Sequence, residues 1–368
     1  MTQSATEWLA ALSPWPADGF GTERVHALLA ELGEPQRRYP AIHVVGTNGK
    51  SSTTRLIEAL LADAGFAVGA YYSPHVRGWS ERIRVRGQDA DFERAVGRVR
   101  DASMRLGATQ FETLTAAALL EFAEAGVDAA VVEAGLGGRH DATNVLSARV
   151  VVLTNVALEH TEVLGDTREA IAAEKLADVA PGATAVLGSA EWEELARANG
   201  ASSVVLTGAS NLALAVAAAE AFLGRDVDPH AAEDVALPGR LERRGEEPLE
   251  IWDGAHNLAG LGYLLPRLPD REWVVCCSIL EDKRPESMLE ALSVLGGTLV
   301  ATESTNPRAL EAGDLARRAE PYFEHVEPLP DPRAARRRAI ELAGPGGAVV
   351  VTGSLYLLSE LSDDRSDP

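Results

Sequence analysis

The amino-acid sequence predicts an α/β protein with two domains, each built around a mostly parallel sheet. Short β-rich runs alternate with amphipathic helical patterns along nearly the whole chain, which is typical of βα units. The length of 368 residues exceeds the size of one domain, which is about 150 residues. Residues 237–248 are rich in charge, Pro and Gly, and the alternation restarts after them. We therefore expect one domain at residues 1–245 and a smaller one at 246–368.

The first domain begins its alternation with a predicted strand at 42–45. A helix is expected over 53–64, with its apolar positions three and four residues apart, and Gly65 ends it. A second strand is expected at 67–72. Later in this domain the pattern predicts strands at 129–132 and 150–153 and a helix from residue 168 to about 179.

The second domain shows the same alternation. Strands are predicted at 249–252, 273–277, 298–301 and 348–351, and helices from Glu286 and Pro332. Both cysteines of the chain, Cys276 and Cys277, fall inside one of these apolar strands, which indicates core residues in a reducing compartment. The tail from Ser362 to Pro368 is expected to be disordered.

The composition restricts the classes of partner. The formal net charge is -21 and 46% of the residues are hydrophobic, which is typical of an acidic globular protein. Nucleic-acid binding needs a basic surface, so we expect no nucleic-acid partner. No apolar run reaches the ~18 residues of a membrane span, and the N-terminus lacks a signal-peptide pattern. We expect a cytoplasmic monomer without a membrane partner.

A glycine-rich turn at 46–52 is the first candidate site. Its sequence, GTNGKSS, lies between a predicted strand and a predicted helix, where backbone N–H groups and the positive helix end bind phosphates. The chain has only three lysines among 34 Lys and Arg, and Lys50 is one of them. Val44 stands where the full Walker motif requires Gly, so only the second half of the motif is present. An ordinary turn is the alternative, and the flanking elements favour phosphate binding.

Polar residues follow the other strands of the first domain. Ser73, Glu133, Asn155 and His160 each come after a predicted strand, and the carboxyl ends of parallel strands meet at one edge of a sheet. Hydroxyl and carboxylate oxygens beside phosphates suit Mg²⁺, whereas histidine is its least typical ligand in this set. Taken singly, Ser73 could cap a turn, Glu133 could pair with an arginine and His160 could be a loop histidine.

Three longer strings are specific in content and order: HVVGTNGK at 43–50, YSPH at 72–75 with ERI at 81–83, and EAGLGGRHDATN at 133–144. Further strings follow at 111–116, 159–161, 174–175, 237–240, 253–257 and 351–356. With these strings the chain resembles the folylpolyglutamate synthase/dihydrofolate synthase family of the Mur ligase superfamily. The resemblance covers roughly residues 5 to 360.

The resemblance implies an ATP-dependent amide ligase with a P-loop domain, a smaller Rossmann-like C-terminal domain and an active site between them. Its cofactors would be ATP and Mg²⁺. Its substrates would be L-glutamate and dihydropteroate or folates, placing it in folate biosynthesis and one-carbon metabolism. The reaction would pass through an acyl phosphate, because a carboxylate is a poor electrophile until it is phosphorylated.

The resemblance also implies roles for individual residues. ATP is expected at Gly46, Thr47, Asn48, Gly49, Lys50, Ser51, Ser52, Asn211, Arg240, Asp253 and His256. The expected metal ligands are Ser73, Glu133, His160 and Lys175, the last as a carbamate. Catalysis is assigned to Lys50, Glu133, His160 and Lys175, and substrate binding to Arg82, Phe111, Glu112, Arg139 and His140. Alternatives remain: Asn211 could cap a helix, Arg240 could form a linker salt bridge, and Lys175 could be a surface lysine or a phosphate-binding cation.

The chain departs from the family pattern at several positions. Ser51 stands where the family usually has Gly, Glu159 where it commonly has Asp, and His140 where it more often has an apolar or aromatic residue. The stretch between about residues 189 and 208 is shorter than usual. Two rival functions are a Mur-type amino-acid ligase acting on a different carboxylate, and a nucleotide-binding protein that has lost catalysis.

Overall fold

The computed structural model describes residues 3–14, 16, 19, 21–233 and 235–362, and the chain divides into two compact units. The first unit comprises residues 1–74 and 79–235, and the second comprises 75–78 and 236–368. This division falls before the predicted boundary at residue 245, because β9 (Glu242–Glu246) pairs with the next strand of the second unit. The short segment 75–78 belongs to the second unit, which no pattern in the sequence indicated. The tail predicted to be disordered lies, from residue 363, outside the described residues.

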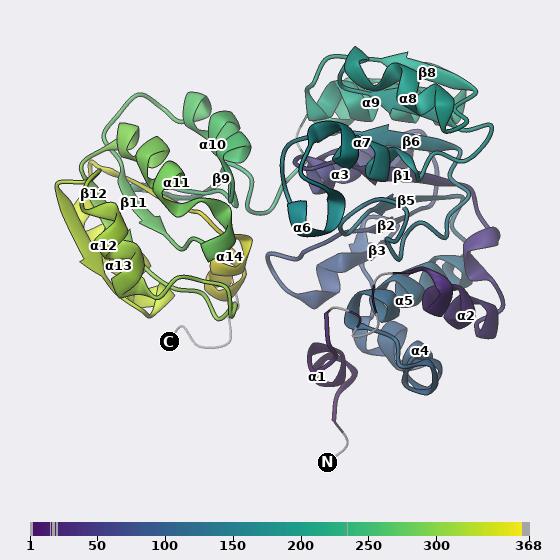
Figure 1. Ribbon diagram of the computed structural model, residues 1–368, viewed down its shortest axis with the longest axis horizontal. Coiled ribbons are helices and arrows are strands. Elements are labelled where there is room, and N and C mark those ends of the chain that lie inside the picture. The colour runs from purple at the N-terminus through teal and green to yellow at the C-terminus, as the bar shows by residue number, and fades with distance from the viewer. Residues whose placement is uncertain (1–2, 15, 17–18, 20, 234, 363–368) are drawn as a thin grey trace. The chain divides into compact units, whose positions relative to one another are not determined.

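The first unit is built on an eight-stranded sheet in the order β4-β3-β2-β5-β1-β6-β7-β8 (Figure 1). All neighbouring strands are parallel except the β2-β3-β4 meander, so the predicted parallel α/β fold is confirmed. The strands are β1 (Ala41–Val45), β2 (Val68–Tyr71), β3 (Ile83–Val85), β4 (Gln88–Asp89), β5 (Ala129–Glu133), β6 (Val150–Leu153), β7 (Thr184–Leu187) and β8 (Ser203–Leu206).

Helices cover both faces of this sheet. Alternate strand residues such as Ile42 and Val152 pack against α3 (Lys50–Asp63) and α9 (Asn211–Leu223). The opposite face, which includes Val151, packs against α7 (Arg168–Leu176) and α8 (Glu193–Ala198). This alternation is the two-residue period of a strand buried on both faces.

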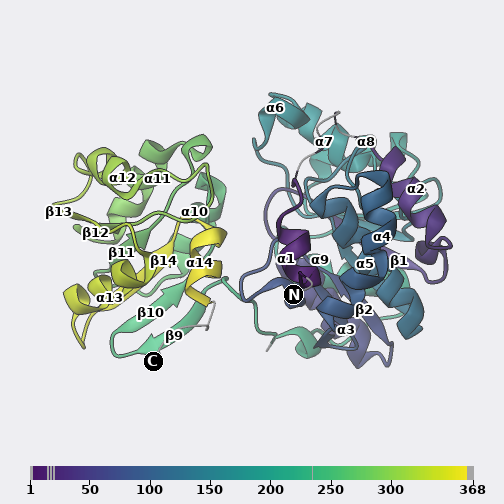
Figure 2. The same cartoon turned by 90° about the horizontal axis from the view of Figure 1, so that it is seen from below.

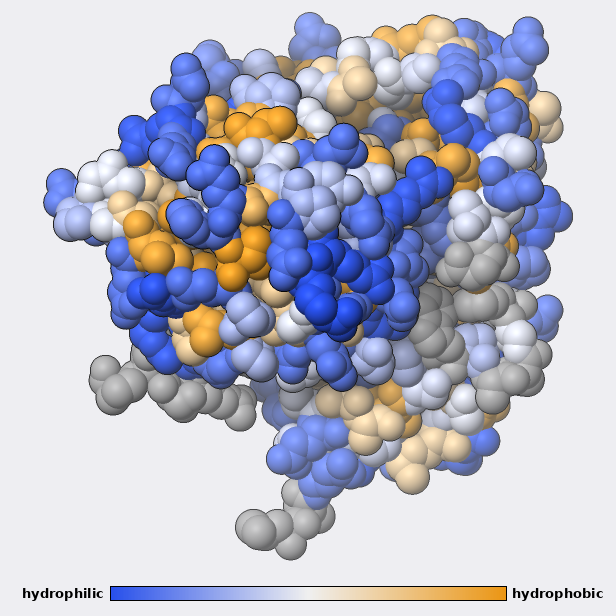
Figure 3. Space-filling view, turned by 60° about the vertical axis from the view of Figure 1, so that its left-hand side comes forward, coloured by the Kyte–Doolittle hydropathy of each residue, from blue (hydrophilic) through white to orange (hydrophobic). Residues whose placement is uncertain are grey.

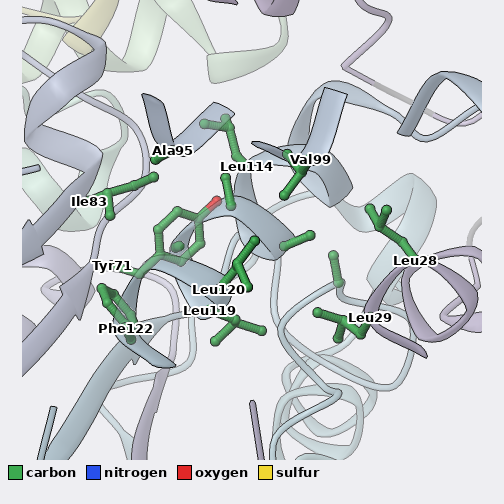
Figure 4. Packing of buried hydrophobic residues seen from close by; sticks show 14 of the residues in the cluster. Leu28, Leu29, Tyr71, Ile83, Ala95, Val99, Leu114, Leu119, Leu120 and Phe122 are labelled. Carbon is green, nitrogen blue, oxygen red and sulfur yellow. The ribbon is translucent and has the colours of Figure 1, made fainter. Parts of the chain in front are cut away.

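A further cluster lies on the β2 side of the same sheet. It combines α1 (Ala5–Ala10), α2 (Glu23–Glu31), α4 (Phe92–Leu106) and α5 (Gln110–Ala125). Figure 4 shows the Tyr71 ring in this cluster beside Ile83, Leu114 and Phe122. Tyr71, Phe122 and Leu114 are fully buried, so the site-bearing strands rest on a well-packed base.

The second unit has a six-stranded sheet in the order β13-β12-β11-β14-β10-β9. Its strands after β9 are β10 (Leu249–Trp252), β11 (Val274–Cys277), β12 (Thr298–Ala301), β13 (His325–Pro328) and β14 (Ala348–Thr352), and these five run parallel. One face packs against α10 (Leu258–Leu264), α11 (Pro285–Leu292) and α12 (Ala312–Ala319), and the other against α13 (Pro332–Ala343) and α14 (Leu355–Ser362). Figure 2 shows these helices on the two sides of the strands. Cys276 and Cys277 lie buried and unbridged in β11, as predicted.

The surface matches the charged composition. Figure 3 shows a face on which hydrophilic side chains predominate and apolar ones lie between them. Within the described ranges, none of the helices has the length and apolar character that crossing a bilayer demands.

Candidate active site

The glycine-rich turn joins β1 to α3, as the sequence predicts. Gly49 adopts a left-handed backbone with φ of 83°, and a Cβ there would lie 2.5 Å from Asn211 Oδ1. At Gly46, with φ of 141°, a Cβ would lie 1.9 Å from Thr154 Oγ1. Both positions therefore require glycine. The predicted ATP residue Asn211, which begins α9, thus lies directly against the turn.

The segment after β6 holds the turn in shape. Asn155 accepts the Asn48 N–H at 3.0 Å and donates its amide to the Asn48 carbonyl at 2.9 Å. The Thr47 N–H donates to the Asn155 carbonyl at 3.0 Å, and the Thr154 hydroxyl donates to the Asn48 carbonyl at 2.7 Å. Sequence reasoning singled out Asn155 as a polar group at this edge and missed Thr154, which has no motif of its own.

Lys50 is the first residue of α3, a helix of 14 residues. Its ammonium donates to the carbonyls of Gly46 at 3.0 Å and Thr47 at 3.2 Å, so the charge lies over the turn. Ser52, two residues further along the same helix, is buried. The free N–H groups and positive dipole at the start of a helix favour an anion at this place.

Glu133 is the last residue of β5, and only 1% of its surface is exposed. Its Oε1 accepts the Ser51 hydroxyl at 2.8 Å, and its Oε2 accepts the Ser73 N–H at 3.0 Å. The structure therefore brings Ser51, Ser73 and Glu133 together from three separate segments. Their hard oxygen atoms fit Mg²⁺, which takes few protein ligands and completes its shell with phosphate and water. No cluster of three or more His, Cys, Asp or Glu side chains suited to a metal occurs among the described residues.

Lys175 lies on α7 and is fully buried beside the same turn. Its ammonium donates to the carbonyls of Gly46 at 3.0 Å and Leu136 at 3.0 Å, and to Glu159 Oε1 at 3.1 Å. Burial lowers the pKa of Lys175, and the neighbouring Glu159 carboxylate opposes that shift. Burial would raise the pKa of Glu159, but Lys175 and Lys50 together bring it below its usual value. Lys175 is therefore no surface lysine.

His160 precedes the short helix α6 (Thr161–Leu164) and has a left-handed φ of 46°. Such a backbone in a residue other than glycine costs about 1–3 kcal/mol and is commonest at functional sites. Its imidazole is close enough to Glu159 to lower the pKa of that carboxyl. The structure thus places His160 beside the Glu159–Lys175 pair.

The loop after β5 is held by Asp141, which the sequence reasoning did not select. Asp141 accepts the N–H groups of Leu136 at 2.7 Å, Gly137 at 2.8 Å and Thr143 at 2.9 Å, and also the Thr143 hydroxyl at 2.5 Å. An Asp within the glycine-rich string at 133–144 could have indicated this role, because Asp side chains commonly accept hydrogen bonds from the backbone of their own turn.

A buried polar pair extends this network. His43 Nε2 lies 2.8 Å from Thr143 Oγ1, and His43 Nδ1 lies 3.7 Å from Asp178 Oδ2. The Thr143 hydroxyl already donates to Asp141, so His43 donates to Thr143. Burial lowers the pKa of His43 to about 4 and raises the pKa of Asp178 well above its usual value. His43 begins the string at 43–50, but nothing in the sequence marked His43 and Asp178 as a buried pair.

The predicted substrate-binding residues differ in their burial and in the contacts that they make. Arg82 is mostly buried, with its guanidinium 4.8 Å from the centre of the Trp79 ring. The ring centre of Phe111 lies 6.0 Å from that of Tyr71. The Phe111 ring also fills the space that a Cβ at Gly135 would need. Glu112 binds Arg24 at 2.8 Å and the Thr109 N–H at 2.7 Å, which gives it a structural task. Arg139 and His140 are exposed.

In the second unit, the predicted ATP residues lie after β10 and just before β9. Asp253 accepts the N–H groups of Leu241 and Ala255, each at 2.8 Å. Burial raises the pKa of Asp253, and Arg240 opposes the shift. Arg240 also donates to the Gly239 carbonyl at 2.9 Å, and His256 Nδ1 donates to the Gly254 carbonyl at 2.8 Å.

Comparison with known proteins agrees with this geometry. The model of the Mur ligase middle domain matches residues 44–225, and that of the Mur ligase glutamate ligase domain matches residues 239–355. A dihydrofolate synthase/folylpolyglutamate synthase of Mycobacterium tuberculosis is 34% identical over 82% of this chain and 77% of its own length. The chain belongs to this ligase family.

Solved structures of family members share the whole architecture. FolC of Escherichia coli in complex with DHPP and ADP has a TM-score of 0.88 at 28% identity, covering 98% of this chain and 97% of its own. The bifunctional family enzyme of Yersinia pestis, complexed with AMPPNP and Mn ion, has a TM-score of 0.86 at 28% identity, covering 98% of both chains. The predicted family and fold are confirmed.

The departures of this family member from the usual pattern have visible partners. Ser51 bonds to Glu133, and Glu159 bonds to Lys175. The short stretch between 189 and 208 still folds, as α8 followed by the edge strand β8. The individual ligand assignments remain predictions.

Proposed function

We propose that this chain is an ATP-dependent ligase that joins L-glutamate to dihydropteroate or to folates through an acyl phosphate. The observation that carries the proposal is the junction of Ser51, Ser73 and Glu133 beside the phosphate-type turn. The names of the relatives support the same reaction class. The complexes of solved relatives with nucleotide, metal and DHPP support ATP, a divalent cation and a pterin-type substrate.

The reaction consists of a phosphoryl transfer followed by an acyl transfer. The carboxylate oxygen of the pterin substrate attacks the γ-phosphorus of ATP, and ADP leaves. The α-amine of glutamate then attacks the acyl carbon, inorganic phosphate leaves with the bond electrons, and the amine loses a proton. Mg²⁺ supplies charge neutralisation on the phosphate oxygens when it is bound.

The residues of this chain bind and orient the phosphates. Lys50 and the start of α3 provide positive charge at the turn, and Asn211 bounds the turn at Gly49. Glu133, Ser73 and His160 are the proposed metal ligands. Both substrates and the nucleotide are anionic whereas the chain carries a net charge of -21, so local cations must attract them. We assign this role to Lys50, Arg82, Arg139 and Arg240.

We also propose that Lys175 reacts with carbon dioxide to form a carbamate. Its lowered pKa favours the neutral amine that attacks carbon dioxide, with release of one proton. A carbamate oxygen would suit Mg²⁺ better than an ammonium would. Native mass spectrometry under ¹³C-labelled carbon dioxide should detect the added mass in wild type and not in Lys175→Arg. Identical spectra of the two proteins would refute the carbamate.

The proposed setting is the cytoplasm, with the chain acting as a monomer. The buried, unbridged cysteines support a reducing compartment. Gel filtration with light scattering at working concentration should give the mass of one chain. A stable dimer mass would contradict the monomer.

A phosphate-release assay tests the function. Dihydropteroate, reduced folates and UDP-muramoyl precursors are each supplied with ATP and Mg²⁺, with and without glutamate. We expect glutamate-dependent phosphate release with the pterin substrates. Turnover only with muramoyl precursors would favour the Mur-type rival, and no turnover with any substrate would favour a nucleotide-binding protein without catalysis.

A further inference from the structure

The carboxylate of Glu133 is held at both oxygens by different parts of the first unit. Ser51, from the start of α3, donates its hydroxyl to Oε1 at 2.8 Å. The Ser73 N–H, from the segment after β2, donates to Oε2 at 3.0 Å. A buried carboxylate with both oxygens bonded cannot rotate without losing a hydrogen bond.

We propose that Ser51 is a positioning residue that orients Glu133 for the divalent cation. This inference deepens the proposed function and rests on it, because it assumes that Glu133 is the metal ligand. The Ser73 contact uses backbone and persists in every side-chain variant. The Ser51 hydroxyl, by contrast, is a contact that substitution can remove.

The position of Ser51 gives this contact a second consequence. Ser51 directly follows Lys50, whose ammonium lies over the phosphate-type turn. One helix start therefore carries both the phosphate cation and the group that holds the metal carboxylate. Glu133 lies 82 positions away in the sequence, on a different strand. The Ser51 hydrogen bond thus sets the carboxylate at a fixed place relative to the phosphates.

Removal of a group that orients a metal ligand typically lowers metal affinity by about 10–100-fold. Ser51→Ala and Ser51→Gly should both show such a loss, because both lack the hydroxyl. Ser51→Thr keeps a hydroxyl at the same atom and should retain most of the affinity. Glu133→Gln defines the loss expected when the ligand itself is altered.

The matched control is Ser103→Ala. Ser103 lies on α4 in the same unit, it is buried, and its hydroxyl has no hydrogen-bond partner among the described residues. Its removal should leave metal affinity, turnover and melting temperature unchanged. The control separates loss of one serine hydroxyl from loss of this particular contact.

The decisive measurement is Mn²⁺ binding to the full chain saturated with AMPPNP, followed by electron paramagnetic resonance and calorimetry without turnover. We expect Ser51→Ala and Ser51→Gly to bind Mn²⁺ at least about 10-fold more weakly than wild type. In turnover, their half-saturating Mg²⁺ should rise while kcat recovers at high Mg²⁺.

Two results would overturn the inference. One is wild-type Mn²⁺ affinity in both Ser51→Ala and Ser51→Gly. The other is an equal loss in Ser51→Thr, which would show that the hydroxyl is not the determinant. Failure of the wild-type protein to bind Mn²⁺ with AMPPNP would instead refute the proposed function.

Discussion

The two units end their parallel strands in polar side chains, but they hold these side chains in different ways. In the first unit, Lys175 bonds to the Gly46 carbonyl across 129 positions, and Ser51 bonds to Glu133 across 82. In the second unit, Asp253 bonds to backbone N–H groups only 12 and 2 positions away. The side chains of Lys175 and Glu133 are thus held by long-range contacts, whereas the hydrogen bonds that the Asp253 carboxylate accepts are local.

This difference predicts which substitutions should affect turnover and stability most. A long-range polar contact joins segments that several strands position, so its loss changes the relative placement of catalytic groups. A local contact shapes one turn, and its loss is confined to that turn. We therefore expect larger effects on turnover and stability from the first unit than from the second.

The largest effect is expected from Lys175→Ala. In the unmodified form of Lys175, the substitution leaves Glu159 mostly buried without its ammonium partner, and breaking a buried ion pair costs about 3–5 kcal/mol. Urea unfolding should show this loss, and turnover should be lost with it. Lys175→Arg keeps the charge and should keep more stability. Wild-type unfolding of Lys175→Ala would contradict the long-range account.

Lys50→Ala should affect turnover and leave the fold intact. The Lys50 ammonium donates to the carbonyls of Gly46 and Thr47 in its own turn, so little packing is lost when it is removed. Loss of one electrostatic group at developing charge typically lowers kcat by roughly 10²–10³-fold. Steady-state kinetics with circular dichroism separate the two effects. Full activity in a folded variant would remove the phosphate role from Lys50.

Asp253→Ala tests the second unit. Two backbone N–H groups, of Leu241 and Ala255, lose their acceptor, which costs about 1–3 kcal/mol. The loss should be smaller than in Lys175→Ala and should appear as faster amide hydrogen exchange near residues 239–256. Faster exchange throughout the first unit as well would contradict the expectation that the loss of a local contact stays local.

Asp178→Asn tests the buried pair by its pH dependence. Burial and the neighbouring Asp141 raise the pKa of Asp178, so folding favours the protonated form of this carboxyl. Its contribution to stability is fully present below the unfolded pKa of about 3.9 and is lost as pH rises, by up to about 1.4 kcal/mol per pH unit. Asn stays neutral, so the variant should gain stability relative to wild type as pH increases. Parallel urea-unfolding curves from about pH 4.5 to 7.5 would contradict this assignment.

The sequence predicts some elements of the fold well, for a physical reason. Strands β6, β10 and β12 match their predicted ranges, because short apolar runs flanked by polar turns define a buried strand. Strand β9, with the sequence ERRGE, has no apolar pattern and forms by pairing with β10. It lies in the charged, Pro- and Gly-rich stretch 237–248, whose composition led to the prediction of a domain boundary at residue 245.

The candidate site likewise contains residues that the sequence predicts and contacts that it does not. Lys50, Ser73 and Glu133 were predicted from their position after strands, because topology brings the carboxyl ends of parallel strands together. The bond between His43 and Thr143 spans 100 positions, and the bond between Glu159 and Lys175 depends on a side-chain orientation. Local sequence patterns contain neither kind of information.

The most direct test of the central claim follows the oxygen of the acceptor substrate. Dihydropteroate labelled with ¹⁸O in its carboxylate is incubated with the chain, ATP, Mg²⁺ and glutamate, and the released phosphate is analysed by mass spectrometry. The acyl-phosphate reaction predicts one ¹⁸O atom in each inorganic phosphate formed, because the attacking carboxylate oxygen leaves with the phosphorus. Phosphate without ¹⁸O, at full glutamate-dependent turnover, would contradict the account.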